Sequence, residues 1–387
     1  MIENRWLILF VLFLARTAMA LQFQSVASTG PFLIDSLAID FASLGLLIGL
    51  YMLPGVVIAL PGGMLGQRFG AKRVVLVGLL LMAIGGALMG LGSSFAMAAA
   101  GRVVSGTGAV LLTVLISKMV ADWFAGREIV TAMSIVIVSW PFGLAVGLVA
   151  YGALATASGW RAVIYVGAIA AIAAFALVAL IYRDPPNIAG ASSSGFRVGL
   201  TRREWRLVLI AGSIWGLFNV AYIVLISFAP DLFTARGYSL AEASSIVSII
   251  GWVLIPLIPF TGMLVERIGW PNAFMAGGLL VAAGAAAALP FTSAPAIVLW
   301  VVAFAIGVPA GLIMALPAQV LRPESRGGGM GVFFTCYYVA MAILPGAAGL
   351  ARDLSGSAAA PALFAAAMTL LCVLGLMLFH AAKQTKQ

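Results

Sequence analysis

The sequence predicts an all-α membrane protein with twelve transmembrane helices in two pseudo-symmetric six-helix bundles. Three observations predict this fold class. The 387-residue chain is 63% hydrophobic and only 9% charged, whereas soluble domains carry about 25% charged residues. Apolar runs of about 20 residues, the length that an α-helix needs to cross ~30 Å of hydrocarbon, recur along the whole chain. Features of the first half return in the second half at a nearly constant offset.

The apolar runs are continuous rather than alternating, so they predict helices and not the strands of a barrel. We expect the twelve spans at residues 6–28, 43–65, 74–92, 95–120, 129–151, 161–182, 206–228, 243–264, 273–290, 296–320, 329–350 and 359–380.

The positive charges predict the orientation of these spans. Of the 21 Lys and Arg residues, fifteen fall in loops on the side of the N-terminus, and only Arg161, Arg236 and Arg352 fall in loops on the other side. This asymmetry is typical of cytoplasmic loops. We therefore expect an integral protein of a bacterial-type cytoplasmic (inner) membrane with both termini in the cytoplasm. The basic residues form no single patch, so the net charge of +9 does not indicate nucleic-acid binding.

The first span has a competing interpretation. Arg5, the apolar run and Ala18-Met19-Ala20 also resemble a signal peptide with its cleavage site. The internal repeat needs residues 6–28 as the partner of 206–228, so we keep this span in the mature protein.

The most polar interior stretch, residues 183–205, contains a Pro-Pro pair and a serine run. It predicts a cytoplasmic linker between an N-terminal bundle at 1–182 and a C-terminal bundle at 206–387.

A shift of 199 positions brings the two halves into register. Pro31 meets Pro230, and Arg127 meets Arg326. The segments that meet are Gly63-Met64-Leu65 with Arg68 and Gly70, and Gly262-Met263-Leu264 with Arg267 and Gly269. Gly152 and Gly159 pair with Gly349 and Gly356 at an offset of 197. The chain therefore contains two parallel six-helix repeats, a layout found in secondary transporters.

Several segments carry a family resemblance. GGMLGQRFGAKR (62–73) resembles the loop signature G-x-L-x-D-R-x-G-R-K of the major facilitator superfamily (MFS), and GMLVERIG (262–269) is similar to its second copy. GRVVSGTGA (101–109) resembles the fourth-helix pattern of the same family. Arg16 and the segments 49–63 and 316–331 resemble the cyanate and nitroimidazole transporter branch more weakly. Gln67 departs from the signature, which has Asp there and uses it in a loop salt bridge.

The resemblance implies a secondary active transporter that works by alternating access, with conformational roles for several residues. Arg68, Glu266 and Arg267 would stabilise one facing state. Arg102 would take part in coupling conformational change or proton movement to transport. The alternative interpretation is that Arg102 is structural and forms hydrogen bonds with neighbouring backbone carbonyls. Pro141 interrupts the fifth span and is expected to kink it.

The positions of the acidic residues argue against several transport and catalytic mechanisms. No Asp, Glu or His falls at mid-membrane depth in the predicted spans, although proton symporters and exporters of cationic drugs commonly place a carboxylate there. Protons remain a possible coupling ion. The spans also contain no paired carboxylates and no Ser-His or Cys-His set, so we expect no enzyme, no catalytic residues, no metal and no cofactor.

Arg16 is the strongest site candidate. It lies ten residues beyond Trp6, about 15 Å into the span, where an arginine costs about 2.5–3.5 kcal/mol on insertion scales. We therefore expect it to face a watery cavity and to recognise an anion.

Other residues are predicted to share this site. Phe23 and Gln24 follow Arg16 on the first span, and the 199 shift places Trp215, Asn219 and Tyr222 at matching positions of the seventh. At least one of Tyr337 and Tyr338 in the eleventh span could hydrogen-bond in the same cavity, and we select Tyr338, which the 199 shift pairs with Ser139. Cation, amides and aromatic rings suit a small planar or aromatic organic anion.

Two alternatives remain open: a multidrug-type exporter of neutral or hydrophobic compounds, and a transporter-like sensor that binds without translocation. In every case we expect a monomer whose partners are a small molecule and the lipid bilayer.

Overall fold

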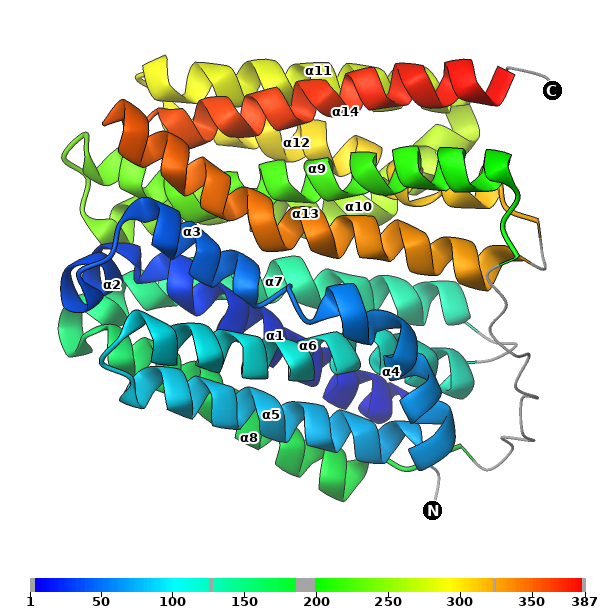
Figure 1. The fold of residues 1–387 in the computed structure, drawn as a ribbon, viewed down its shortest axis with the longest axis horizontal. Helices are drawn as coiled ribbons and strands as arrows, with labels where there is room; N and C mark the ends of the chain where they lie inside the picture. Colours follow the sequence, from blue (N-terminus) through cyan, green and yellow to red (C-terminus); the bar gives the residue numbers. More distant parts are fainter. Residues whose placement is uncertain (1–3, 125–127, 186–198, 323–324, 385–387) are drawn as a thin grey trace. The chain divides into compact units, whose positions relative to one another are not determined.

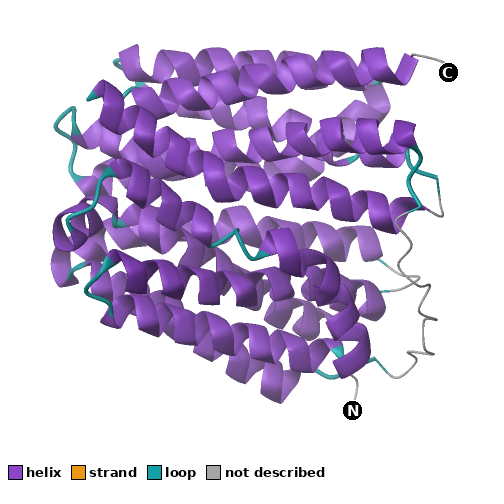
Figure 2. Ribbon diagram, viewed as in Figure 1, coloured by secondary structure: helices purple, strands orange, loops and turns teal. Residues whose placement is uncertain are grey.

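The computed structural model describes residues 4–124, 128–185, 199–322 and 325–384, and within these ranges it contains helices and no strand. Twelve helical segments are long and apolar enough to cross a membrane, so the predicted fold class is confirmed (Figures 1 and 2). The elements are α1 (Arg5–Ser28), α2 (Gly30–Leu37), α3 (Phe41–Leu50), α4 (Gly55–Phe69), α5 (Ala71–Leu91), α6 (Phe95–Trp123), α7 (Ile129–Ser158), α8 (Trp160–Ile181), α9 (Arg202–Thr234), α10 (Leu240–Ile268), α11 (Pro271–Ala288), η1 (Leu289–Phe291), α12 (Pro295–Met314), η2 (Pro317–Gln319), α13 (Arg326–Ser355) and α14 (Ala360–Gln384).

The helices form two compact units. Unit 1 comprises Met1–Ile39 and Leu50–Ser194, and unit 2 comprises Asp40–Gly49 and Gly195–Gln387. The predicted two-bundle division differs from these units mainly at residues 40–49, which pack with unit 2. Most of the predicted linker, residues 186–198, lies outside the described residues.

Unit 1 is built around α1. This helix packs against α6, α7 and α8, while α5 packs against α6 and α8. Small residues allow close approach between α1 and α7: a Cβ added at Gly143 would press on Ala20, and one added at Gly147 would press on Gln24. Such small-residue contacts are the usual way in which membrane helices pack.

Unit 2 is built around α9, the counterpart of α1 in the repeat. The helices α10, α13 and α14 pack against it, and α12 packs against both α10 and α11. Because α9 is covered on several sides, most of its residues between Val220 and Phe233 are buried.

The repeat is visible in the backbone at four helix ends. Gly70 and Gly269 follow α4 and α10, and Gly159 and Gly356 follow α7 and α13. All four have positive φ, between +64° and +86°, a region that glycine enters without the steric cost of a Cβ. Each half therefore ends the corresponding helices with a glycine of positive φ, although ψ differs between Gly159 (164°) and Gly356 (9°).

The second span departs from the prediction of one helix over 43–65. Residues 51–54 form a turn that separates α3 from α4, seen as a loop between two helices in Figure 2. Pro54 cannot donate the helical hydrogen bond to Leu50, and it disfavours helical backbone at Leu53. The corresponding helix of unit 2, α10, is continuous. The helix α7 is likewise continuous through Pro141, which does not interrupt it.

One buried carboxylate organises the start of α9. Glu204 is 4% exposed and completes a capping box with Thr201. Its Oε1 also accepts hydrogen bonds from Ser325 Oγ at 2.6 Å and from Arg322 Nε at 3.1 Å. A single side chain thus joins the first turn of α9 to the segment that precedes α13.

This geometry predicts that Glu204→Gln destabilises unit 2, because the neutral amide loses the ion pair with Arg322. The expected loss is about 1–3 kcal/mol, which lowers Tm by roughly 3–8 °C in thermal unfolding of the detergent-purified protein. The matched control is Glu242→Gln, which changes an exposed capping box of the same kind with Ser239. Equal decreases for the two variants would contradict the role assigned to Glu204.

Candidate functional site

Arg16 lies at the middle of α1, about 17 Å from the first residue of that helix. Its side chain is half-buried, whereas its neighbours Ala15 and Thr17 are buried. A permanent cation at this position of a membrane-spanning helix requires polar surroundings. The position is therefore consistent with the predicted anion-recognition role.

Arg102 is the second arginine within a span of unit 1, and its environment is different. It is 1% exposed, and it donates hydrogen bonds to the backbone carbonyls of Gln22 at 3.0 Å and Phe23 at 3.4 Å. Its guanidinium lies over the ring of Tyr51, 4.4 Å from the ring centroid. This geometry favours the structural interpretation of Arg102, since the cation is used to hold α6 against α1.

A buried polar network surrounds Arg102, and the sequence-based interpretation missed two of its members. Tyr51 donates to the Met19 carbonyl at 3.2 Å, and Gln22 donates through Nε2 to the Met82 carbonyl at 2.7 Å. These bonds tie α1 to the turn after α3 and to α5. The available sequence signal was a glutamine and a tyrosine within apolar runs, where a buried polar group must find a hydrogen-bond partner.

Phe23 and Gln24 are both 0% exposed. The Phe23 ring packs edge-to-face on Tyr51 and lies 5.3 Å from the ring of Trp140. Gln24 donates to Ser28 Oγ at 3.1 Å and packs against Gly147 of α7. The structure places these two residues in the packing of unit 1, so of the three α1 candidates only Arg16 is partly exposed.

In unit 2, the half-buried Trp215 lies in an aromatic cluster. Its ring stacks on Phe218 and Phe333, at centroid distances of 5.8 and 6.3 Å, and lies 6.4 Å from Tyr337. Asn219 turns back along α9 and donates to the Trp215 carbonyl at 2.8 Å. The structure therefore brings Trp215 and Asn219 together, with Tyr337 as a neighbour.

Tyr222 and Tyr338 are more deeply placed, 9% and 5% exposed. The Tyr222 hydroxyl has no hydrogen-bond partner among the described residues. The Tyr338 ring packs edge-to-face on Tyr337 at 4.9 Å. Of the two adjacent tyrosines, Tyr337 is the one that contacts Trp215, although Tyr338 was the predicted site residue.

The predicted gating residues of the loops are at helix ends. Arg68 and Arg267 occupy the last turns of α4 and α10, and both are exposed, as is Gln67. The Arg68 guanidinium lies 5.4 Å from the centroid of the Phe69 ring. The side chain of Glu266 lies outside the described residues, so its predicted loop contact has no structural description.

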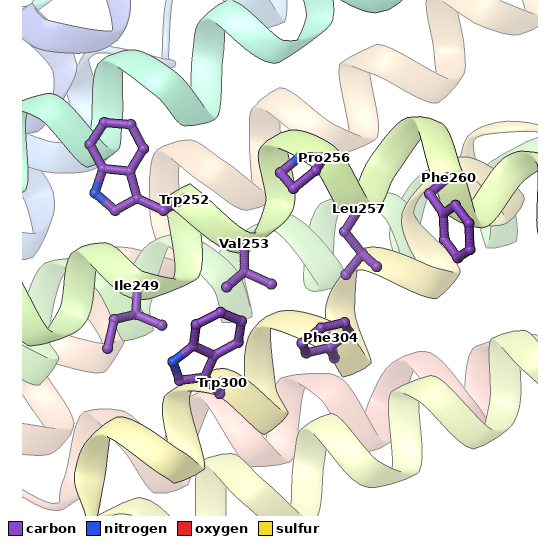
Figure 3. A pocket seen from close by; sticks show the side chains of 8 residues that line it. All are labelled: Ile249, Trp252, Val253, Pro256, Leu257, Phe260, Trp300 and Phe304. Carbon is purple, nitrogen blue, oxygen red and sulfur yellow. The ribbon is translucent and has the colours of Figure 1, made fainter.

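An apolar cavity of about 590 Å³ lies between α10 and α12 in unit 2. Figure 3 shows it lined by Trp252, Trp300, Phe260 and Phe304 with shorter aliphatic side chains between them. It contains none of the predicted site residues. Across the part of the chain that the structure describes, no group of three His, Cys, Asp or Glu side chains could hold a metal ion.

The Arg102 network predicts a graded loss of stability. Arg102→Lys keeps the charge but cannot reach both carbonyls and stack on Tyr51, so we expect a loss of about 2–3 kcal/mol. Tyr51→Phe keeps the ring and removes one hydroxyl, so we expect about 1 kcal/mol. Thermal unfolding measures both, with Arg73→Lys at an exposed position as the control. An Arg102→Lys protein as stable as the parent would contradict the structural role.

Relatives and solved structures are similar to this chain over most of its length. The 2-nitroimidazole transporter of Escherichia coli (strain K12) is 26% identical over 95% of this chain and 94% of its own. The hexuronate transporter of Bacillus subtilis (strain 168) is 24% identical over 64% of this chain. The chain spans only 61% of the length of that hexuronate transporter.

Among solved structures, a D-xylose-proton symporter has a TM-score of 0.79 at 17% identity and covers 97% of both chains. A mutant of the nucleoside transporter NupG has a TM-score of 0.78 at 15% identity, over 96% of this chain and 99% of its own. At these identities the structures support the fold alone. The sequence profile described as Major Facilitator Superfamily matches residues 8–345 and 221–387. The chain therefore belongs to the major facilitator superfamily of transporters.

Proposed function

We propose that this protein is a secondary active transporter that moves a small organic anion across the cytoplasmic membrane by alternating access, with Arg16 as the anion-recognition residue. Its substrate is planar or aromatic, and protons are a possible coupling ion. The protein acts as a monomer with both termini in the cytoplasm.

The observation that carries the proposal is the contrast between the two arginines of unit 1. Arg102 is buried, and its guanidinium is engaged by carbonyls and rings. Arg16 lies at the same kind of apolar depth but keeps part of its side chain exposed. A guanidinium offers a fork of N–H donors that matches a carboxylate, so an arginine that is only half-buried at this depth is suited to an anionic ligand.

Two further observations support the substrate class. The half-buried ring of Trp215, with Tyr337 nearby, gives unit 2 an aromatic surface on which a planar ring can stack. One relative is named for a hexuronate, which is an anion.

A second candidate is a transporter of neutral planar compounds. It is favoured by the relative named as a 2-nitroimidazole transporter, which matches almost the whole chain. In this candidate the aromatic residues carry recognition, and Arg16 contributes a hydrogen bond to a polar substituent rather than a charge pair.

A thermal-shift screen separates these candidates. Benzoate, glucuronate, 2-nitroimidazole and tetraphenylphosphonium are each added to the purified protein, and a ligand at 100 times its Kd stabilises the folded state by about 2.7 kcal/mol. We expect an anion to raise the Tm of the parent, and we expect Arg16→Ala to abolish this anion-dependent increase relative to its own ligand-free Tm.

The matched control is Arg73→Ala, which removes an exposed arginine of α5 and should retain the full anion-dependent increase. An anion-dependent increase that survives Arg16→Ala would contradict the recognition role. An increase with 2-nitroimidazole but with neither anion would favour the second candidate.

A further inference from the structure

The first two turns of α9 carry exposed side chains of two kinds, cationic and apolar. Arg202 and Arg206 are exposed, and Trp205 and Leu209 are 39% and 43% exposed. At about 100° per residue, these four positions fall within about 100° of the helix circumference. They therefore share one exposed face of α9.

The nearest carboxylate does not neutralise this face. Glu204 lies on the far side of the helix, where it is 4% exposed and pairs with Arg322. The ion pairs among the described residues include neither Arg202 nor Arg206. Both cations are therefore available to an anion from outside the protein.

The end of α14 adds positive charge beside this face. Arg203 donates a hydrogen bond to the Lys383 carbonyl at 2.7 Å, so the two helix ends are in contact. Lys383 in turn donates through Nζ to Gln319 Oε1 at 2.9 Å. Together with Arg202 and Arg206, four cations lie at the ends of two adjacent helices. Clusters of this size next to a membrane span attract anionic headgroups.

The length of α9 places this face at the membrane surface. The helix has 33 residues, which corresponds to about 50 Å, whereas the hydrocarbon core of a bilayer is about 30 Å thick. Its first turns therefore reach the headgroup region, where tryptophan is enriched and where arginine extends its guanidinium toward phosphates. The charge asymmetry of the loops predicts that this surface is the cytoplasmic one.

We propose that the face formed by Arg202, Trp205, Arg206 and Leu209 binds one anionic phospholipid of the inner leaflet. The phosphodiester lies between the guanidiniums of Arg202 and Arg206, whose positions are about 6 Å apart along the helix axis. The first part of an acyl chain lies along Trp205 and Leu209. This binding is independent of Arg16 and of the transported substrate.

The apolar pair favours a lipid over a soluble phosphate. A soluble anion would engage only the two guanidiniums and would leave Trp205 and Leu209 without an apolar contact. A phospholipid satisfies both kinds of side chain, because its phosphate and its acyl chains are joined at the depth at which the face changes from cationic to apolar.

Native mass spectrometry of the full-length protein measures this binding. Phosphatidylglycerol and phosphatidylcholine with identical acyl chains are titrated separately, and we expect the parent to bind phosphatidylglycerol more tightly. Arg202→Gln with Arg206→Gln should weaken phosphatidylglycerol binding about thirtyfold, because two contacts between an arginine and an anionic lipid are lost. Binding of phosphatidylcholine should be unchanged.

The matched control is Arg73→Gln with Arg183→Gln. It removes two exposed arginines that share no helix face and changes the net charge by the same amount, so it should keep the phosphatidylglycerol affinity of the parent. An equal loss in the two double variants would overturn the site, because it would show only the attraction of the whole basic surface. Displacement of the lipid by an equal concentration of inorganic phosphate would overturn the assignment to a lipid.

Fluorescence quenching locates the bound lipid. Phosphatidylglycerol with brominated acyl chains is mixed at a low mole fraction with phosphatidylcholine around the reconstituted protein. We expect the quenched fraction of tryptophan fluorescence to fall in Trp205→Phe and in Arg202→Gln with Arg206→Gln, but not in the control pair. Brominated phosphatidylcholine at the same mole fraction should not produce this difference. Equal quenching in the parent and in Trp205→Phe would contradict the proposed site.

Discussion

The structure of unit 1 depends on how a buried guanidinium is satisfied. Arg102 is removed from water, and an unpaired charge in such a place would cost several kcal/mol. It is satisfied instead by two backbone carbonyls of α1 and by the ring of Tyr51. This one group therefore fixes the distance between α1 and α6 and anchors the turn that divides the second span.

The two arginines within the spans of unit 1, Arg102 and Arg16, differ in burial. Arg102 is buried and bonded to α1, whereas Arg16 on α1 is only half-buried. The turn that contains Tyr51 separates α3 from α4. The helix α3 packs on α13 through glycines and through the hydrogen bond from Ala42 to Asp353.

The fold could be predicted because its signals are local and repeated. Long apolar runs identify spans whatever their neighbours are, and glycines such as Gly70 and Gly269 recur because the same turn requires positive φ in each half. Pro54 is also the residue that breaks the second span. The break was not predicted because the apolar run continues through this proline without a polar residue. Proline is no sure guide in membrane helices, since Pro141 lies within a continuous helix.

The site could be predicted only in part, because helical spacing shows which residues share a face but not what covers that face. Phe23 and Gln24 were placed with Arg16 by the sequence, yet both are buried, with Trp140 and Gly147 of α7 packed against them. The sequence left open whether Tyr337 or Tyr338 serves the site, and in the structure Tyr337 is the one whose ring lies near Trp215. Which residue of a helix faces its neighbour depends on packing between helices, which a single sequence does not encode locally.

The central claim is that Arg16 recognises an anion that the protein carries across the membrane. Its most direct test is uptake of radiolabelled benzoate and glucuronate into proteoliposomes with no nucleotide present. The account predicts saturable uptake of at least one anion, reduced more than tenfold by Arg16→Ala and unchanged by Arg73→Ala. Uptake that persists in Arg16→Ala, or anion binding without any uptake, would contradict it.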